Sequence, residues 1–116
     1  MSRNFEELEV WKRACRLAVE IYKALADSRE YSLKDQMTRA AVSVASNIAE
    51  GAERATQKEY LRFLDIAKGS AGELRTQLYI IVKLHIINKV EAQKLIEETR
   101  VISKMLQALQ NALRKG

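Results

Sequence analysis

The feature that most constrains this chain is the complete absence of proline from its 116 residues, together with a total of only four glycines. Sheet-rich proteins need a turn about every 8–12 residues, and proline and glycine supply many of those turns. A chain this poor in both favours long helices joined by a few short loops. Hydrophobic residues make up 47% of the sequence, which is typical of a globular protein with a packed core. The length allows one such domain, spanning residues 1–116.

Apolar residues recur at spacings of three and four along the chain, and this period predicts amphipathic helices. The first predicted helix runs from about Phe5 to Ala26 and has two adjacent apolar stripes. One stripe contains Leu8, Trp11, Cys15, Ala18, Tyr22 and Leu25. The other contains Val10, Ala14, Leu17 and Ile21. So wide an apolar surface is consistent with a well-filled core and equally with a subunit interface.

Capping residues predict where the second helix begins and ends. Ser32 has the side chain of an N-cap, and Asp35 three residues later suits the positive end of the helix dipole. The helix is expected to continue to about Glu50, with Gly51 as its C-cap glycine.

The third and fourth helices have clearer start signals. Thr56 and Glu59 have the spacing of a capping box, and the helix that they begin is expected to run to about Ile87. Asn88 is expected to cap the fourth helix. Four amphipathic helices with short connections predict an all-α fold, an antiparallel up-down-up-down four-helix bundle.

The sequence offers little of the chemistry that an enzyme needs. A metal site requires clustered ligands, and the chain has one histidine, His85, and one cysteine, Cys15. It has no glycine loop of Walker spacing and no Glu-x-x-His pair of the di-iron bundle type. We therefore expect no catalytic residues, metal, cofactor or small-molecule substrate. Because no segment resembles a signal peptide or a membrane span, we expect a cytoplasmic protein with no membrane partner.

Polar side chains recur at helical spacing on the second and third helices, among many small residues. They are Arg39, Ser43, Asn47, Glu50, Ser70, Glu73 and Gln77. They could lie on two ordinary solvated faces, or they could form a structural network between closely packed helices. We favour the network, with Arg39 facing Glu50 or Glu73, because polar groups held between helices must pair with one another.

The net charge of +5 comes entirely from residues 56–116, which carry eleven basic and six acidic side chains. At about 100° per residue, five basic residues fall on one side of the fourth helix, opposite its leucines. The candidate phosphate contacts are Lys89, Arg100, Lys104, Arg114 and Lys115, with Lys68 and Arg75 on the third helix. These charges could equally serve solubility alone. With few aromatics nearby, contact with a nucleic-acid backbone is the expected mode of binding rather than base stacking.

Three stretches together resemble the proteins encoded within intervening sequences of bacterial 23S rRNA genes. They are LEVWK at 8–12, YSLKDQMTRAAVSVASNIAEG at 31–51 and EYLRFLDIAKGSAGELRTQL at 59–78. The resemblance implies a four-helix bundle that assembles into a homopentameric ring. It also implies kinship with the accessory variability determinant proteins of diversity-generating retroelements, which are basic pentamers that associate with a reverse transcriptase and nucleic acid. The family motif falls on Asn47, Glu50, Gly51, Ser70 and Glu73, which implies a structural or assembly role for these residues.

Two functions remain open at this point. The first is a non-enzymatic, homo-oligomeric scaffold that binds the backbone of RNA or DNA and can act as an accessory factor to a reverse transcriptase. The second is a protein–protein interaction or assembly module encoded in an rRNA intervening sequence, with no affinity for nucleic acid. The dependence of binding on salt separates them, because only phosphate contacts weaken steeply as salt rises.

Overall fold

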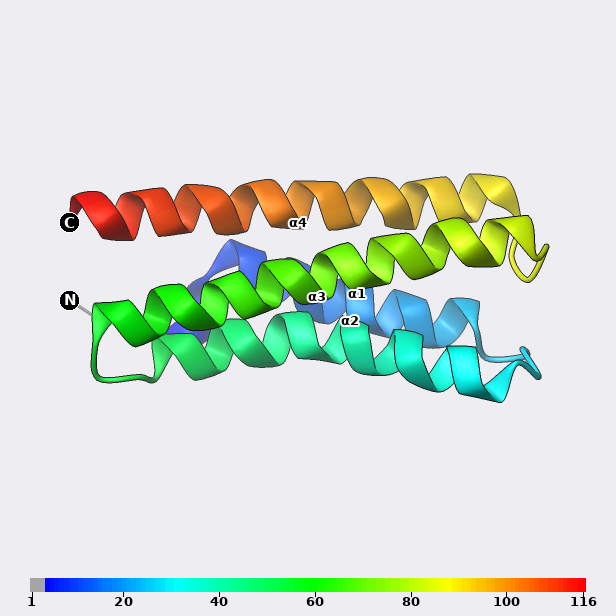
Figure 1. Ribbon diagram of the computed structural model, residues 1–116, viewed down its shortest axis with the longest axis horizontal. Helices are drawn as coiled ribbons and strands as arrows, with labels where there is room; N and C mark the ends of the chain where they lie inside the picture. Colours follow the sequence, from blue (N-terminus) through cyan, green and yellow to red (C-terminus); the bar gives the residue numbers. More distant parts are fainter. Residues whose placement is uncertain (1–3) are drawn as a thin grey trace.

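Four long α-helices make up most of the computed structural model, which describes residues 4–116 (Figure 1). A short 3-10 helix, η1, precedes them, and the described residues contain no β-strand. The elements are η1 (Phe5–Glu7), α1 (Glu9–Ala24), α2 (Tyr31–Ala52), α3 (Gln57–Lys83) and α4 (Lys89–Lys115). The expectation of an all-α, four-helix fold is confirmed.

The helices lie side by side in a bundle of about 46 × 20 × 20 Å, and the loops alternate between its two ends (Figure 1). In cyclic order, α1 packs on α2, α2 on α3, α3 on α4, and α4 on α1. The α2–α3 contact is the most extensive and the α1–α4 contact is the sparsest of the four. The backbones of α1 and α3 are not neighbours in the described part of the chain, so these two helices occupy opposite corners of the bundle.

The core buries one apolar stripe of α1 completely and the other only in part. Val10, Ala14, Leu17 and Ile21 are all buried. In the other stripe, Ala18 and Leu25 are buried, but Trp11 and Cys15 are half-buried and Tyr22 is 53% exposed. Part of the apolar surface of α1 is therefore left outside the core of the bundle.

Two predicted N-caps are confirmed. The Thr56 hydroxyl accepts a hydrogen bond from the Glu59 backbone N–H at 3.1 Å, and Asn88 Oδ1 accepts one from the Glu91 N–H at 2.8 Å. The Glu59 carboxylate accepts hydrogen bonds from the Arg62 guanidinium. A capping box consists of two hydrogen bonds, and the cap of α3 has the one that the Thr56 hydroxyl accepts.

Both predicted ends of α2 are wrong. The helix begins at Tyr31 with Glu30 at the N-cap, so Ser32 lies inside its first turn. It continues past Glu50 to Ala52, with Glu53 at the C-cap, so Gly51 is a helical residue. A Cβ atom on Gly51 would lie 2.8 Å from Phe63 Cβ, so a glycine is needed here for the close approach of α2 and α3, and not to end the helix.

The first and third helices are shorter than predicted. The turn of η1 is separated from α1 by the extended residue Leu8, and α1 ends at Ala24. α3 ends at Lys83 rather than Ile87, because His85 adopts a left-handed conformation with φ 59°. The Ile86 N–H donates to the Ile81 carbonyl at 3.0 Å, which closes the helix end in the manner of a Schellman motif.

Candidate nucleic-acid interface

A small polar cluster, made of Ser43, Asn47 and Ser70, joins α2 to α3. The Ser43 and Ser70 hydroxyls are 2.9 Å apart, and Asn47 Nδ2 donates to the Ser43 hydroxyl at 2.9 Å and to the Ser43 carbonyl at 2.8 Å. These three members of the expected network are brought together by the packing of α2 on α3. Small side chains at this seam allow hydroxyl groups from the two helices to reach each other directly.

The other four expected members do not join the cluster. Arg39 pairs with Asp35 at 3.0 Å, so its predicted pairing with Glu50 or Glu73 is wrong. Glu50 pairs with Arg54 at 2.7 Å. Both are i, i+4 pairs formed without the second helix, one within α2 and one between α2 and the residue after its C-cap.

Glu73 is exposed and forms no ion pair within residues 4–116. Gln77 is 6% exposed, and its side-chain carbonyl oxygen has no hydrogen-bond partner among the described residues. In the described part of the chain, Glu73 thus has a charge without an ion-pair partner, and Gln77 has a hydrogen-bond acceptor without a donor.

The two candidate phosphate contacts on α3 instead hold α3 against α4. Arg75 Nε donates to the Thr99 hydroxyl and its Nη2 to the Ser103 hydroxyl, both at 3.0 Å. Lys68 Nζ donates to Gln107 Oε1 at 2.7 Å. Since these donors already have partners across the seam, Lys68 and Arg75 are less available for phosphate than their position in the sequence suggests.

Gln110 is a further contact across this seam that the sequence analysis missed. It is fully buried, and its Nε2 donates to the Leu61 carbonyl at 3.2 Å and to Asp65 Oδ1 at 2.8 Å. The hydrogen bond from Gln110, aided by the charges of Lys68 and Arg114, lowers the pKa of Asp65. The sequence did contain a signal, because Gln110 follows Leu106 by four residues and precedes Leu113 by three, which places it on the core side of α4.

The candidate cations on α4 fall into two groups. Arg100 donates to the Tyr79 hydroxyl at 2.6 Å and lies 3.4 Å from the Glu97 carboxylate. The remaining four are exposed and form no ion pair or hydrogen bond with any side chain in the described range. They are Lys89, Lys104, Arg114 and Lys115.

The unpaired cations follow the length of α4 and do not gather at one spot. At a rise of 1.5 Å per residue, Lys89 and Lys115 are about 39 Å apart along the helix, and Lys104 lies between them. This span is close to one turn of a nucleic-acid duplex, about 34–36 Å. The arrangement can make several separate contacts with a phosphate backbone.

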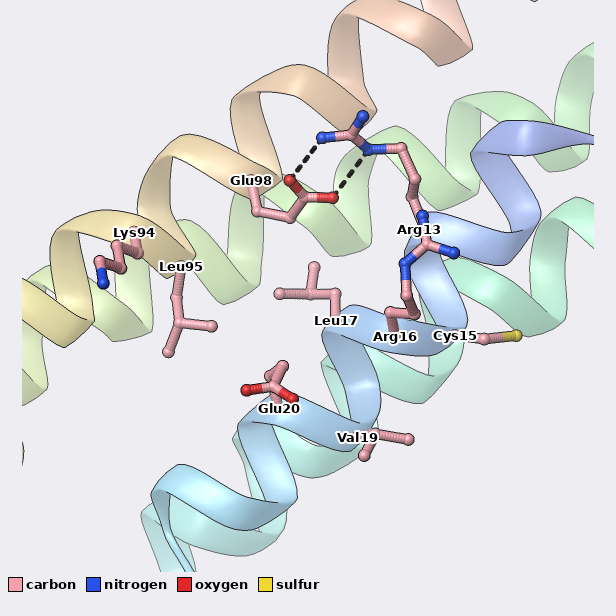
Figure 2. A pocket seen from close by; sticks show the side chains of 9 residues that line it. All are labelled: Arg13, Cys15, Arg16, Leu17, Val19, Glu20, Lys94, Leu95 and Glu98. Atoms are coloured by element: carbon pink, nitrogen blue, oxygen red, sulfur yellow. Dashed lines mark hydrogen bonds and ion pairs between the residues drawn. The ribbon is translucent and has the colours of Figure 1, made fainter.

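A groove on the other side of α4 separates it from α1 (Figure 2). Its volume is about 660 Å³, and Leu17 and Leu95 are among its apolar lining residues. Arg13 reaches across it, with Nη2 2.7 Å and Nε 2.9 Å from the two oxygens of Glu98. This hydrogen bonding raises the pKa of Arg13 further above its ordinary value.

The lining of this groove shows no catalytic grouping. Cys15 lies at its edge, where partial burial raises the pKa of the thiol and so keeps it protonated at neutral pH. Across residues 4–116, no three histidine, cysteine or acidic side chains are grouped so as to hold a metal ion. None of the helices in that range is long and apolar enough to span a bilayer.

The fold and sequence are similar to those of known proteins. A crystal structure from Bacteroides thetaiotaomicron VPI-5482, described as a protein of unknown function from the S23 ribosomal protein family, superposes with a TM-score of 0.82 at 23% identity. The match covers 87% of this chain and 97% of the Bacteroides chain. No curated protein matches the sequence. The profile of the 23S rRNA-intervening sequence proteins matches residues 6–108, and the chain therefore belongs to that family.

Proposed function

We propose that the chain is a non-enzymatic subunit of a homopentameric ring of antiparallel four-helix bundles, which binds the phosphate backbone of RNA or DNA along α4. The observation that carries the proposal is a row of four exposed cations on one side of that helix, Lys89, Lys104, Arg114 and Lys115, which form no ion pair within residues 4–116. A surface that serves only solubility normally mixes charges of both signs. The one acidic residue on this side of α4, Glu97, is already paired with Arg100.

The geometry supports contact with the backbone and not with the bases. Lysine and arginine side chains along a straight helix can neutralise successive phosphates, and this contact carries no sequence information. The one aromatic side chain bonded to the basic side of α4, Tyr79, has its hydroxyl engaged by Arg100. A reverse transcriptase is the protein partner that we add to the proposal, on the resemblance to the retroelement accessory proteins.

The proposal is tested by measuring how binding depends on salt. Purified protein is titrated against labelled structured RNA and duplex DNA between about 50 and 200 mM salt, and wild type is compared with the double variant Lys104→Gln, Arg114→Gln. We expect weaker binding for the variant, with a salt slope reduced by about one for each lost phosphate contact.

The matched control removes the same charge elsewhere on the molecule. Lys23 and Arg29 are exposed near the turn between α1 and α2, so the variant Lys23→Gln, Arg29→Gln should keep the wild-type slope. Equal losses in both double variants would mean that net charge and not α4 attracts the nucleic acid. If wild type does not bind even at low salt, the nucleic-acid part of the proposal is wrong.

A second candidate function is a module that binds other proteins, and the apolar groove between α1 and α4 favours it. Binding through this groove would bury the exposed side chain of Val19, beside Leu17 and Leu95, and this apolar contribution would respond little to salt. This function is supported if a purified reverse transcriptase partner binds with an affinity that the Lys104→Gln, Arg114→Gln variant leaves unchanged.

A further inference from the structure

The bundle leaves an apolar groove open between α1 and α2. Its volume is about 360 Å³, and its lining is almost entirely apolar: Phe5, Trp11, Cys15, Ala18, Val42, Ala45, Ser46 and Ala49. The α1 members recur at spacings of four and three, and the half-buried Trp11 and Cys15 are part of the stripe that the core covers only partly. A groove between two helices with this spacing has the shape that a third helix fills.

A second unusual surface lies on the outer side of α3. Its stripe has heptad spacing, and all five of its members are exposed: Ile66, Gly69, Glu73, Thr76 and Ile80. The outer face of a bundle helix is normally polar, yet Ile66 is 38% and Ile80 46% exposed. We name these five residues the α3 outer stripe.

Gly69, the second member of the stripe, has no neighbour inside the protomer that requires a glycine. A Cβ atom at this position would have no atom within 4 Å, so neither packing nor a turn requires a glycine here. A glycine within a helix costs about 1 kcal/mol relative to alanine. A helix surface that another backbone approaches closely is one place where that cost is offset.

The two surfaces cannot meet within one protomer. The groove lies between α1 and α2, whereas the residues of the α3 outer stripe are exposed. The helix α3 itself is at the corner of the bundle opposite α1 (Figure 1). Their charges are complementary. Neither Glu73 on the stripe nor Lys12, an exposed base on α1 beside Trp11, has an ion-pair partner among the described residues.

We propose that the α3 outer stripe of one copy packs into the α1–α2 groove of the next copy. The contact is head-to-tail, since it joins two different surfaces of the same chain, and contacts of this type produce a ring when the rotation closes. This inference rests on the oligomeric part of the proposed function and locates its interface. Ile66 and Ile80 fill the groove on either side of Gly69, where the two backbones come closest.

The first test places a large side chain at position 69. We expect Gly69→Leu to reduce the mass of the purified full-length protein, measured by light scattering, from the oligomer toward the protomer. Its helical circular dichroism should stay the same, because a Cβ atom at this exposed position has no atom of the protomer within 4 Å. Gly72→Leu is the matched control, since Gly72 is also open but lies about 80° around the helix from the stripe. It should leave the oligomer intact.

The second test uses Cys15, which is the only cysteine and lines the groove. A second cysteine is placed on the stripe in three separate variants, Ile66→Cys, Thr76→Cys and Ile80→Cys. Mild oxidation of at least one variant should give a ladder of disulfide-linked dimers, trimers and larger species. Wild type, with one cysteine, can give dimers at most. Ala108→Cys, on the exposed side of α4, should give no ladder.

The outcomes separate this inference from the proposed function. If wild type is a protomer at all concentrations, the oligomeric part of the proposed function is wrong, and this inference with it. If wild type is oligomeric but Gly69→Leu assembles normally and no stripe cysteine gives a ladder, only the interface is wrong. If Gly69→Leu fails to fold, the disulfide ladder alone decides.

Discussion

At the scale of single residues, the glycines of α2 and α3 differ in how much space surrounds them. Gly51 is buried where α2 meets α3, close to Phe63 and Tyr60. The Phe63 ring also lies against two guanidinium groups, with the Arg54 and Arg62 carbons 4.7 and 4.6 Å from its centroid. The absence of a side chain at Gly51 therefore sets the distance between the helices at this end of the bundle.

We expect Gly51→Ala to lower the free energy of unfolding by about 1–2 kcal/mol. The new methyl group would lie 2.8 Å from Phe63 Cβ and 3.2 Å from the Tyr60 carbonyl oxygen, so backbone atoms would have to move. Overpacking of this kind costs about 1–3 kcal/mol, partly offset by the better helix propensity of alanine. Urea unfolding at one fixed protein concentration measures the difference.

Gly72→Ala is the control for that measurement. It has the same chemical change in a helix, but nothing lies within 4 Å of the added Cβ. The propensity term then acts alone, and the variant should gain up to about 1 kcal/mol. Equal stability changes at Gly51 and Gly72 would contradict the role assigned to Gly51.

At the scale of helices, the sequence predicts what depends on neighbouring residues in the chain. Thr56 and Asn88 are correct caps because each one bonds a backbone group three residues away. The presence of four helices could be predicted from the period of the apolar residues and from the lack of proline. The period could not show which of two stripes on α1 faces the core, because that depends on where α2 and α4 lie.

The candidate site shows the same limit. Ser43, Asn47 and Ser70 were singled out by spacing, and they do meet. Lys68 and Arg75 were predicted to be phosphate contacts like the cations of α4. The sequence shows on which side of its helix a residue lies, but it does not show which residues of the neighbouring helix lie opposite. The register between the helices brings Arg75 opposite Thr99 and Ser103 and so gives it partners.

The α1–α4 contact is the sparsest, so we expect its one ion pair to contribute measurably to stability. Arg13 and Glu98 form two hydrogen bonds, and their side chains are 32% and 28% exposed. Charge-assisted bidentate pairs are stronger than typical surface pairs. Glu98→Gln should therefore lower the free energy of unfolding by about 1 kcal/mol.

Glu97→Gln is the comparison for Glu98→Gln in the same urea experiment. Glu97 is the preceding residue on the same helix, but its side chain is 62% exposed and contacts only Arg100, at 3.4 Å within α4. Loss of that contact should change stability by less than about 0.5 kcal/mol. If the two variants are indistinguishable, the Arg13–Glu98 pair does not hold α1 on α4.

At the scale of the whole molecule, one protomer offers few strong contacts to nucleic acid. The four cations on the basic side of α4 are spread over about 39 Å of the helix, nearly the full 46 Å length of the bundle. Each such contact is weakened by salt. Assembly would place several copies of this line of charge on one particle, and linked sites bind a long ligand far more tightly than one site does.

Assembly and nucleic-acid binding should therefore be coupled, although no cation lies on the α3 outer stripe. We expect Gly69→Leu, with every basic residue of α4 intact, to weaken binding to a duplex of about 50 base pairs by tenfold or more. A duplex of about 10 base pairs, one helical turn, reaches few protomers at once and should bind wild type and variant alike. Fluorescence anisotropy with both duplexes at one salt concentration measures this. An equal loss on the short duplex would mean that the substitution has damaged the binding surface itself. No loss on either would mean that a single protomer is the complete binding unit.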